Sequence, residues 1–147
     1  MDGWEIDARE GARDLIGAYT HAGDRRRLHE LAALFGNDGV LETHGMWSVT
    51  GAYAIASKLA ESAGRRRPQL VRHNVSSIWF GSVQPGEIHA ESYFTVYTDL
   101  GPDHWGRYRD RIVGSGTTWH FAHRLVRIDS AAENSYITWP LPESDGE

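Results

Sequence analysis

One histidine lies in a segment whose remaining residues are typical of a buried strand. The segment covers residues 69–80 and contains His73. Because strand side chains alternate between two faces, His73 shares its face with Val71, Val75, Ser77 and Trp79. Burial and neighbouring charges adjust the pKa of an imidazole in such a row, and its ordinary pKa suits proton transfer near neutral pH. The pattern favours general acid or base chemistry at His73.

The strands that follow supply further polar groups, and the lengths of their turns predict the registers. Pairing Val113 with Thr118 places Tyr108 opposite His123. The predicted outer face carries a row of arginines: Arg107, Arg109, Arg111 and Arg124. The predicted inner face is apolar apart from four polar side chains: His73, Tyr108, Asp110 and His123.

Asp110 is the most demanding member of this predicted inner face. Pairing Trp79 with Ile88 puts His73 opposite Phe94, and the next hairpin then puts Phe94 beside Asp110. A carboxylate buried without a partner would cost several kcal/mol. Asp110 must therefore be paired, be protonated, or line a wet cavity.

Hydrophobic periodicity predicts three helices in the first half of the chain, with one short strand between the second and third, and only strands after them. The expected helices cover residues 6–21, 25–35 and 51–63, and the expected strands cover residues 40–44, 69–80, 87–98, 106–113 and 118–128. The tail from residue 130 has two prolines and several acids, which predicts irregular structure. This order indicates a single α+β domain over residues 1–147, with a cone-shaped curved antiparallel sheet packed against three N-terminal helices. A curved sheet of this kind leaves room for an internal cavity.

Composition excludes several classes of function. The 147 residues are 40% hydrophobic and carry a net charge of −5, which is typical of a globular domain and not of a general nucleic-acid binder. The chain has no cysteine, so thiol catalysis and cysteine-bound metals are excluded. Its eight histidines show no HExxH spacing, and no glycine-rich phosphate loop occurs, so we expect neither metal nor cofactor. With no leader or membrane-length apolar run, we expect a cytoplasmic protein that does not bind membranes.

Several segments resemble the SnoaL-like polyketide cyclases. Residues 15–24 and 28–40 resemble the first two helices of that family, and residues 70–75, 106–113 and 118–126 resemble its later strands. The resemblance extends over residues 7–128. It implies the nuclear transport factor 2-like fold, which scytalone dehydratase, ketosteroid isomerase, limonene epoxide hydrolase and the small subunit of ring-hydroxylating dioxygenases share. Fold alone does not transfer function among these proteins.

The resemblance also implies site residues. Asp24 matches the pocket acid that follows the first helix in cyclase and dehydratase members, and His73 matches their strand histidine. Tyr19 falls where the steroid isomerases have an oxyanion-holding tyrosine. Asp110 falls near their protonated aspartate, which donates a hydrogen bond to the same oxygen.

The chain departs from two relatives of this fold. Where the isomerases have their general base, it has Thr43 or His44 and no aspartate. Where the epoxide hydrolases need an arginine and an aspartate two residues apart, it has Tyr108 and Asp110. The pattern therefore disfavours epoxide hydrolysis and leaves His73 as the predicted base.

These residues, with the roles that the resemblance implies for them, predict a small cofactor-free enzyme of the cyclase, dehydratase or isomerase type. His73 would move a proton next to a carbonyl group, assisted by Asp24, although Asp24 can equally be read as a helix N-cap before Arg25. Tyr19 and Tyr108 would hold the developing enolate oxygen, and Asp110 would donate to it if protonated. The expected substrate is a small, apolar, ring-bearing carbonyl compound, with binding walls from these residues: His123, Phe94, Trp79, Trp119, Phe121 and Trp47.

An alternative from another class is a non-catalytic ligand-binding or assembly subunit, like the dioxygenase small subunit. Asp110 would then form a structural ion pair with an arginine, and side chains would fill the cone. For either function the resemblance implies a homo-oligomer, a dimer or trimer, formed through the outer face of the sheet. Tyr93, Tyr97 and Glu91 are the residues expected to contribute to that interface.

Overall fold

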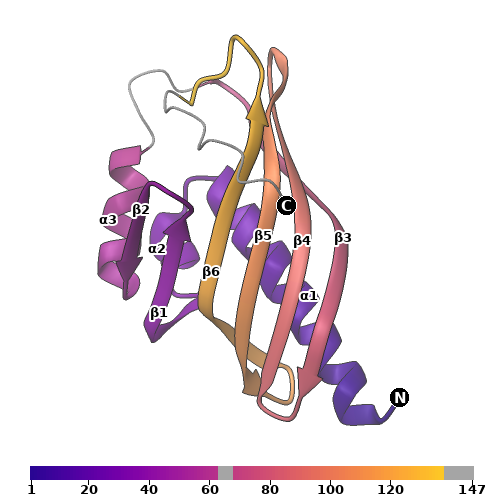
Figure 1. Cartoon of the computed structure of the whole chain (residues 1–147). Coiled ribbons are helices and arrows are strands. Elements are labelled where there is room, and N and C mark those ends of the chain that lie inside the picture. The colour runs from indigo at the N-terminus through magenta and orange to yellow at the C-terminus, as the bar shows by residue number, and fades with distance from the viewer. Residues whose placement is uncertain (63–67, 138–147) are drawn as a thin grey trace.

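Three helices lie on one side of a long curved sheet (Figure 1). The computed structural model describes residues 1–62 and 68–137. In it, α1 covers Gly3–Asp24, α2 covers Leu28–Ala32 and α3 covers Ala52–Ser62. Helix α1 crosses the sheet because its apolar residues recur at helical spacing and bury one stripe: Ala8, Ala12, Leu15, Ile16 and Tyr19.

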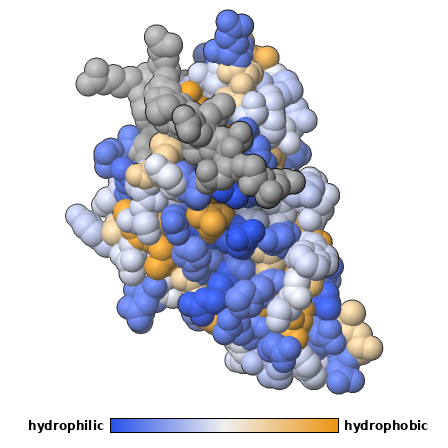
Figure 2. Space-filling view, in the orientation of Figure 1, coloured by the Kyte–Doolittle hydropathy of each residue, from blue (hydrophilic) through white to orange (hydrophobic). Residues whose placement is uncertain are grey.

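The six strands form one sheet in the order β2-β1-β6-β5-β4-β3. Their bounds are Phe35–Thr43 for β1, Trp47–Thr50 for β2, Val71–Gln84 for β3, Glu87–Thr98 for β4, Gly101–Ser115 for β5 and Thr118–Ala131 for β6. Burial alternates along β4, as the period-two pattern predicts for a strand with one face in the core. The face of the molecule in Figure 2 is mostly hydrophilic, with scattered apolar patches.

The predicted α+β class is confirmed, with a strand between the second and third helices and four long strands after the third, but several elements differ from the prediction. The second helix is shorter than predicted, because Phe35 begins a strand and packs its ring 5.2 Å from Phe121. Strand β2 was not predicted. Strand β1 runs parallel to β6, whereas the prediction was a wholly antiparallel sheet. The last part of the predicted irregular tail, residues 138–147, lies outside the described residues.

The predicted strand registers are wrong, because the turns are tighter than the predicted loops. Ser115 pairs with Thr118 across a two-residue turn in which Gly116 has φ 58°. This turn and a bulge in β6 together pair Tyr108 with Val126 and not with His123. The predicted loop over residues 99–105 is mostly strand, since Thr98 already pairs with Gly101.

Tight turns and register shifts together change the partners of the other inner-face residues. His73 lies opposite Val96, not Phe94. Phe94 lies opposite Gly106, not Asp110.

Two β-bulges also exchange the faces of predicted inner residues. One lies between Ser76 and Trp79, where Ser77 has φ 52°, and it turns Trp79 outward to 64% exposure. The other inserts Ala122 into β6, because Ile112 pairs with Phe121 whereas Arg111 pairs with His123.

The second bulge exchanges the places of two charged or titratable side chains. Arg124, predicted on the outer face, is buried in the core. His123, predicted on the inner face, lies on the outer side and contacts Glu42 at 2.9 Å.

None of the helices in the described part of the chain is both long and apolar enough to cross a membrane.

Candidate active site

A cavity of about 430 Å³ lies between the helices and the sheet. Most of its wall is apolar, from residues that include Leu28, Leu31, Leu41, Trp47, Leu59, Phe94, Val126 and Ile128. Polar or charged residues line it at a few places: Tyr19, Thr20, Asp24, Arg26, Thr43, Lys58, His73, His104 and Tyr108. An apolar cavity with a few convergent polar groups is the usual form of a small-molecule site. The predicted internal cavity is therefore present, and it is not filled by side chains.

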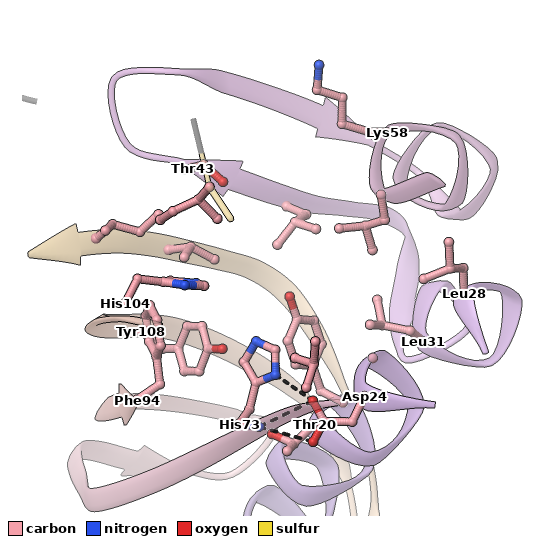
Figure 3. Close-up of a pocket in the computed structure, with 18 of the residues that line it drawn as sticks. Thr20, Asp24, Leu28, Leu31, Thr43, Lys58, His73, Phe94, His104 and Tyr108 are labelled. Atoms are coloured by element: carbon pink, nitrogen blue, oxygen red, sulfur yellow. Dashed lines mark hydrogen bonds and ion pairs between the residues drawn. The ribbon is translucent and has the colours of Figure 1, made fainter. Parts of the chain in front are cut away.

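His73 and Asp24 meet at the wall of this cavity (Figure 3). Asp24 is the last residue of α1, and its Oδ1 lies 2.5 Å from Nδ1 of His73. The backbone N–H of His73 also donates to the Asp24 carboxylate, 3.1 Å from Oδ2. Asp24 is therefore a partner of His73 and not a helix N-cap, because α2 has Arg27 at its N-cap position and no side-chain cap from Asp24.

The contact with Asp24 determines which nitrogen of His73 faces the cavity. A carboxylate only accepts hydrogen bonds, so the His73 proton lies on Nδ1. Nε2 points away from Asp24 and into the cavity (Figure 3), and it carries the lone pair whenever the ring is neutral. A neutral imidazole held in this tautomer is a general base in the correct orientation.

Tyr19 and Tyr108 form an aromatic floor beside this pair. Their ring centroids are 6.0 Å apart in an edge-to-face arrangement, and Phe94 stacks on Tyr108 at 4.6 Å. Burial raises the pKa of both phenols, although the Arg124 charge works in the opposite direction. Both hydroxyls therefore keep their protons at neutral pH, as hydrogen-bond donors to a substrate oxygen must.

Asp110 lies behind the floor and does not line the cavity. It accepts hydrogen bonds from Nε and Nη2 of Arg124 at 2.8 and 2.9 Å, and both side chains are 0% exposed. Burial alone would lower the pKa of Arg124, but the Asp110 carboxylate more than offsets this effect and raises it. The sequence hypothesis of a protonated Asp110 that donates to substrate does not fit this arrangement, in which both oxygens accept from arginine.

The guanidinium group of Arg124 packs against the rings of Tyr19 and Tyr108. Its guanidinium carbon lies 3.7 Å from the ring centroid of Tyr108 and 4.2 Å from that of Tyr19. Cation–π contacts of this kind are strongest where water is excluded. The buried ion pair therefore holds both tyrosines in place. Sequence reasoning missed this role because nothing in the residues around Arg124 reveals the bulge.

His104 is a second cavity histidine that sequence analysis missed. It lies on β5 with its Nδ1 2.8 Å from Oδ2 of Asp103, and both residues are buried. Burial lowers the pKa of His104, against the opposing effect of Asp103, so the ring is neutral at neutral pH. A signal was available in the sequence, since counting back by two from Tyr108 through Gly106 reaches His104, but Pro102 and Gly101 suggested a loop.

The predicted wall residues divide into two groups. Phe94 and Trp47 line the cavity. Trp119 and Phe121 are buried away from it, and Nε1 of Trp119 donates to the backbone oxygen of Gly116 at 2.8 Å. The remaining two predicted wall residues, Trp79 and His123, are on the outer side because of the bulges described above.

No metal site is formed by the residues that the structure describes, since they contain no group of three or more histidine, aspartate or glutamate side chains placed to hold an ion.

The chain thus combines a curved, helix-backed sheet with a His–Asp pair in an apolar cavity. The chain belongs to the SnoaL-like domain family, whose profile matches residues 4–125. No curated protein matches the chain.

Solved structures with the same fold include proteins of different kinds. A scytalone dehydratase-like protein from Novosphingobium aromaticivorans has a TM-score of 0.78 at 22% identity, with 95% of each chain covered. ActVI-ORFA from Streptomyces coelicolor has a TM-score of 0.72 at 22% identity, over 82% of this chain and 96% of its own.

A beta subunit assigned to an aromatic-ring-hydroxylating dioxygenase, also from N. aromaticivorans, has a TM-score of 0.71 at 19% identity, over 90% of this chain and 96% of its own. At these identities the likenesses establish the fold and leave the chemistry to be argued from the site.

Proposed function

We propose that this protein is a small enzyme that moves a proton on an apolar, ring-bearing carbonyl compound without a bound cofactor. The observation that carries the proposal is the His73–Asp24 pair, which is held at 2.5 Å and opens into an apolar cavity of about 430 Å³. Two protonated phenols reach the same cavity, so a base and oxyanion donors are available together.

The chemistry follows from the positions of these groups. Nε2 of His73 takes a proton from the carbon next to the carbonyl group, the electron pair of that C–H bond forms a C=C bond to the carbonyl carbon, and the C=O π pair moves to the oxygen. Asp24 stabilises the imidazolium that forms, and the hydroxyls of Tyr19 and Tyr108 donate to the enolate oxygen. Return of the proton to another carbon isomerises the substrate. Loss of a β-hydroxyl as water dehydrates it, and attack of the enolate on a second carbonyl closes a ring.

The first experiment is deuterium uptake by a panel of planar cyclic ketones in D2O, measured by mass spectrometry. We expect enzyme-dependent uptake that falls by about 10²-fold or more in His73→Ala, the usual range for a lost general base. The matched control is His123→Ala, because His123 is also hydrogen-bonded to a carboxylate but lies outside the cavity. Undiminished uptake in His73→Ala would remove the proposed base.

A binding or assembly subunit is the second candidate, and the Asp110–Arg124 ion pair is the observation that favours it. The sequence alternative predicted such a pair together with a filled cone, whereas the cone here is open. Ketone binding without deuterium uptake in the wild-type protein would support this candidate over the enzyme.

We also propose that the outer face of the sheet forms a homo-oligomer. Tyr93 and Tyr97 are 56% and 41% exposed on that face, where Arg109 and Glu91 form an ion pair. Light scattering should give a dimer or trimer for the wild-type protein and a monomer for Tyr93→Glu. An unchanged mass in that variant would place the interface elsewhere.

A further inference from the structure

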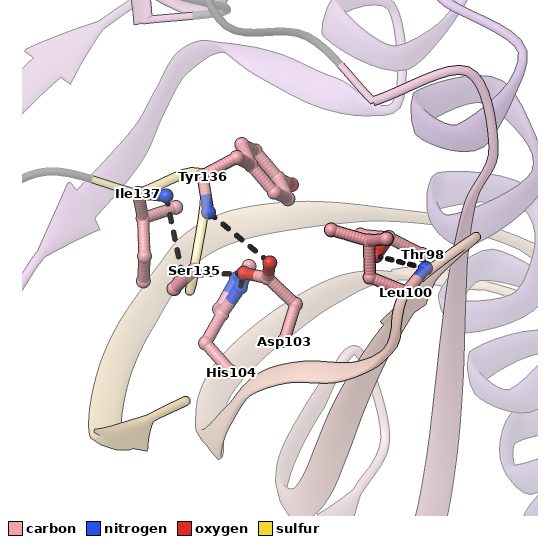
Figure 4. A network of polar contacts seen from close by, with 7 residues as sticks. All are labelled: Thr98, Leu100, Asp103, His104, Ser135, Tyr136 and Ile137. Carbon is pink, nitrogen blue, oxygen red and sulfur yellow. Dashed lines mark hydrogen bonds and ion pairs between the residues drawn. The ribbon is translucent and has the colours of Figure 1, made fainter. Parts of the chain in front are cut away.

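One buried carboxylate holds both a cavity histidine and the segment that follows the last strand (Figure 4). Asp103 is 4% exposed, and its Oδ2 accepts from Nδ1 of His104 at 2.8 Å and from Oγ of Ser135 at 2.5 Å. Its Oδ1 accepts from the backbone N–H of Tyr136 at 3.1 Å. The backbone oxygen of Asp103 also accepts from N–H of Ala132 at 2.7 Å.

The held segment, residues 132–137, is part of the cavity wall. Tyr136 and Ile137 both line the cavity. The ring of Tyr136 packs edge-on against the His104 ring, with centroids 5.7 Å apart. A displacement of the segment would therefore open the cavity and expose the histidine at the same time.

We propose that Asp103 is a positioning residue that couples closure of residues 132–137 over the cavity to the orientation of His104. Its Oδ2 serves both tasks, because it accepts from His104 and from Ser135, while Oδ1 accepts from Tyr136, so neither contact breaks without disturbing the other. The contact with Nδ1 holds one tautomer of His104, as a second carboxylate–histidine pair beside His73 and Asp24. The coupling rests on the proposed function only in that it concerns the same cavity.

The groups that face His104 make the coupling measurable. Among the described residues, the titratable groups that face it include Asp103 on its own strand, His73 on β3 and Tyr136 on the segment. Burial lowers the pKa of His104, and the Asp103 carboxylate works against it. Opening the segment should raise that pKa toward its ordinary value, whereas removing the carboxylate charge should lower it further. Opening the segment and removing the carboxylate charge therefore shift the His104 pKa in opposite directions.

The test uses the full chain and needs no substrate. Nitrogen-15 NMR of the imidazoles follows the tautomer and pKa of His104, whose signals are assigned with His104→Gln, and hydrogen exchange follows the Tyr136 amide. We expect Ser135→Ala to accelerate Tyr136 exchange at least about tenfold and to raise the His104 pKa. We expect Asp103→Asn to accelerate exchange as well, but to leave the His104 pKa lower than in Ser135→Ala, because the carboxylate charge that raises it is lost.

Thr98→Val is the matched control, because Thr98 accepts a hydrogen bond from Leu100 nearby without touching Asp103 (Figure 4). It should leave both readouts unchanged. Faster Tyr136 exchange in Ser135→Ala with unaltered His104 signals would overturn the coupling, and so would unaltered exchange in both variants. Because neither readout depends on turnover, a protein without ketone chemistry can still show the coupling, and the two proposals fail separately.

Discussion

Asp24 ends α1 with its carboxylate turned toward β3, where it accepts both the backbone N–H and the ring N–H of His73. The first contact positions the strand and the second selects the tautomer. An asparagine in the same place can keep the backbone contact through its oxygen, but it cannot stabilise an imidazolium. The two tasks of Asp24 are therefore separable by a single substitution.

For Asp24→Asn we expect ketone deuterium uptake to fall by about 10²–10⁴-fold while the fold is kept. Uptake is measured by mass spectrometry and folding by circular dichroism. Glu42→Gln is the control, because the Glu42 carboxylate is hydrogen-bonded to His123 outside the cavity. Uptake at the wild-type rate in Asp24→Asn would show that His73 needs no charged partner.

The Asp110–Arg124 pair makes a prediction about stability. Arg124→Met leaves Asp110 fully buried without a partner, and breaking a buried pair costs about 3–5 kcal/mol. The double variant Asp110→Leu with Arg124→Met should regain most of that loss, because no uncompensated charge remains. Urea unfolding measures both variants. If the double variant lost as much stability as Arg124→Met and Asp110→Leu lose separately, added together, the loss in Arg124→Met would not come from the broken ion pair.

Within α1, two glycines provide a comparison between elements. A Cβ at Gly11 would lie 2.4 Å from Cδ1 of Trp119 on β6, whereas one at Gly17 would meet nothing within 4 Å. We expect Gly11→Ala to destabilise the protein by about 1–3 kcal/mol through overpacking. Gly17→Ala should stabilise it by about 0.5–1 kcal/mol, because alanine loses less entropy in a helix. Thermal unfolding tests both, and equal effects would mean that α1 moves easily on the sheet.

The strands show where prediction from sequence ends. Alternation correctly placed His73, Phe94 and Tyr108 toward the core, because these residues precede or avoid the bulges. Trp79 and His123 were misplaced, since each follows an inserted residue that reverses the parity of its strand.

For the whole molecule, the lowered pKa of His104 predicts loss of stability in acid. The unfolded chain binds a proton at this histidine near its ordinary pKa of 6.5, but the folded protein binds it only at lower pH. Stability from this group is therefore complete above about pH 6.5 and declines as pH falls toward the folded pKa. Urea unfolding at several pH values should show a smaller acid decline in His104→Gln. An identical decline would mean that His104 keeps its ordinary pKa in the fold.

The sequence alone determined the α+β class, the order of elements and the expectation of a cavity containing His73, Asp24, Tyr19 and Tyr108. Those inferences rest on local periodicity and on a family resemblance that extends over most of the chain. The tertiary structure alone decided that Arg124 is buried against Asp110 and that Asp103 joins His104 to residues 132–137. Turn lengths and bulges set these contacts, and a difference of one residue in either exchanges the core and solvent faces of a strand.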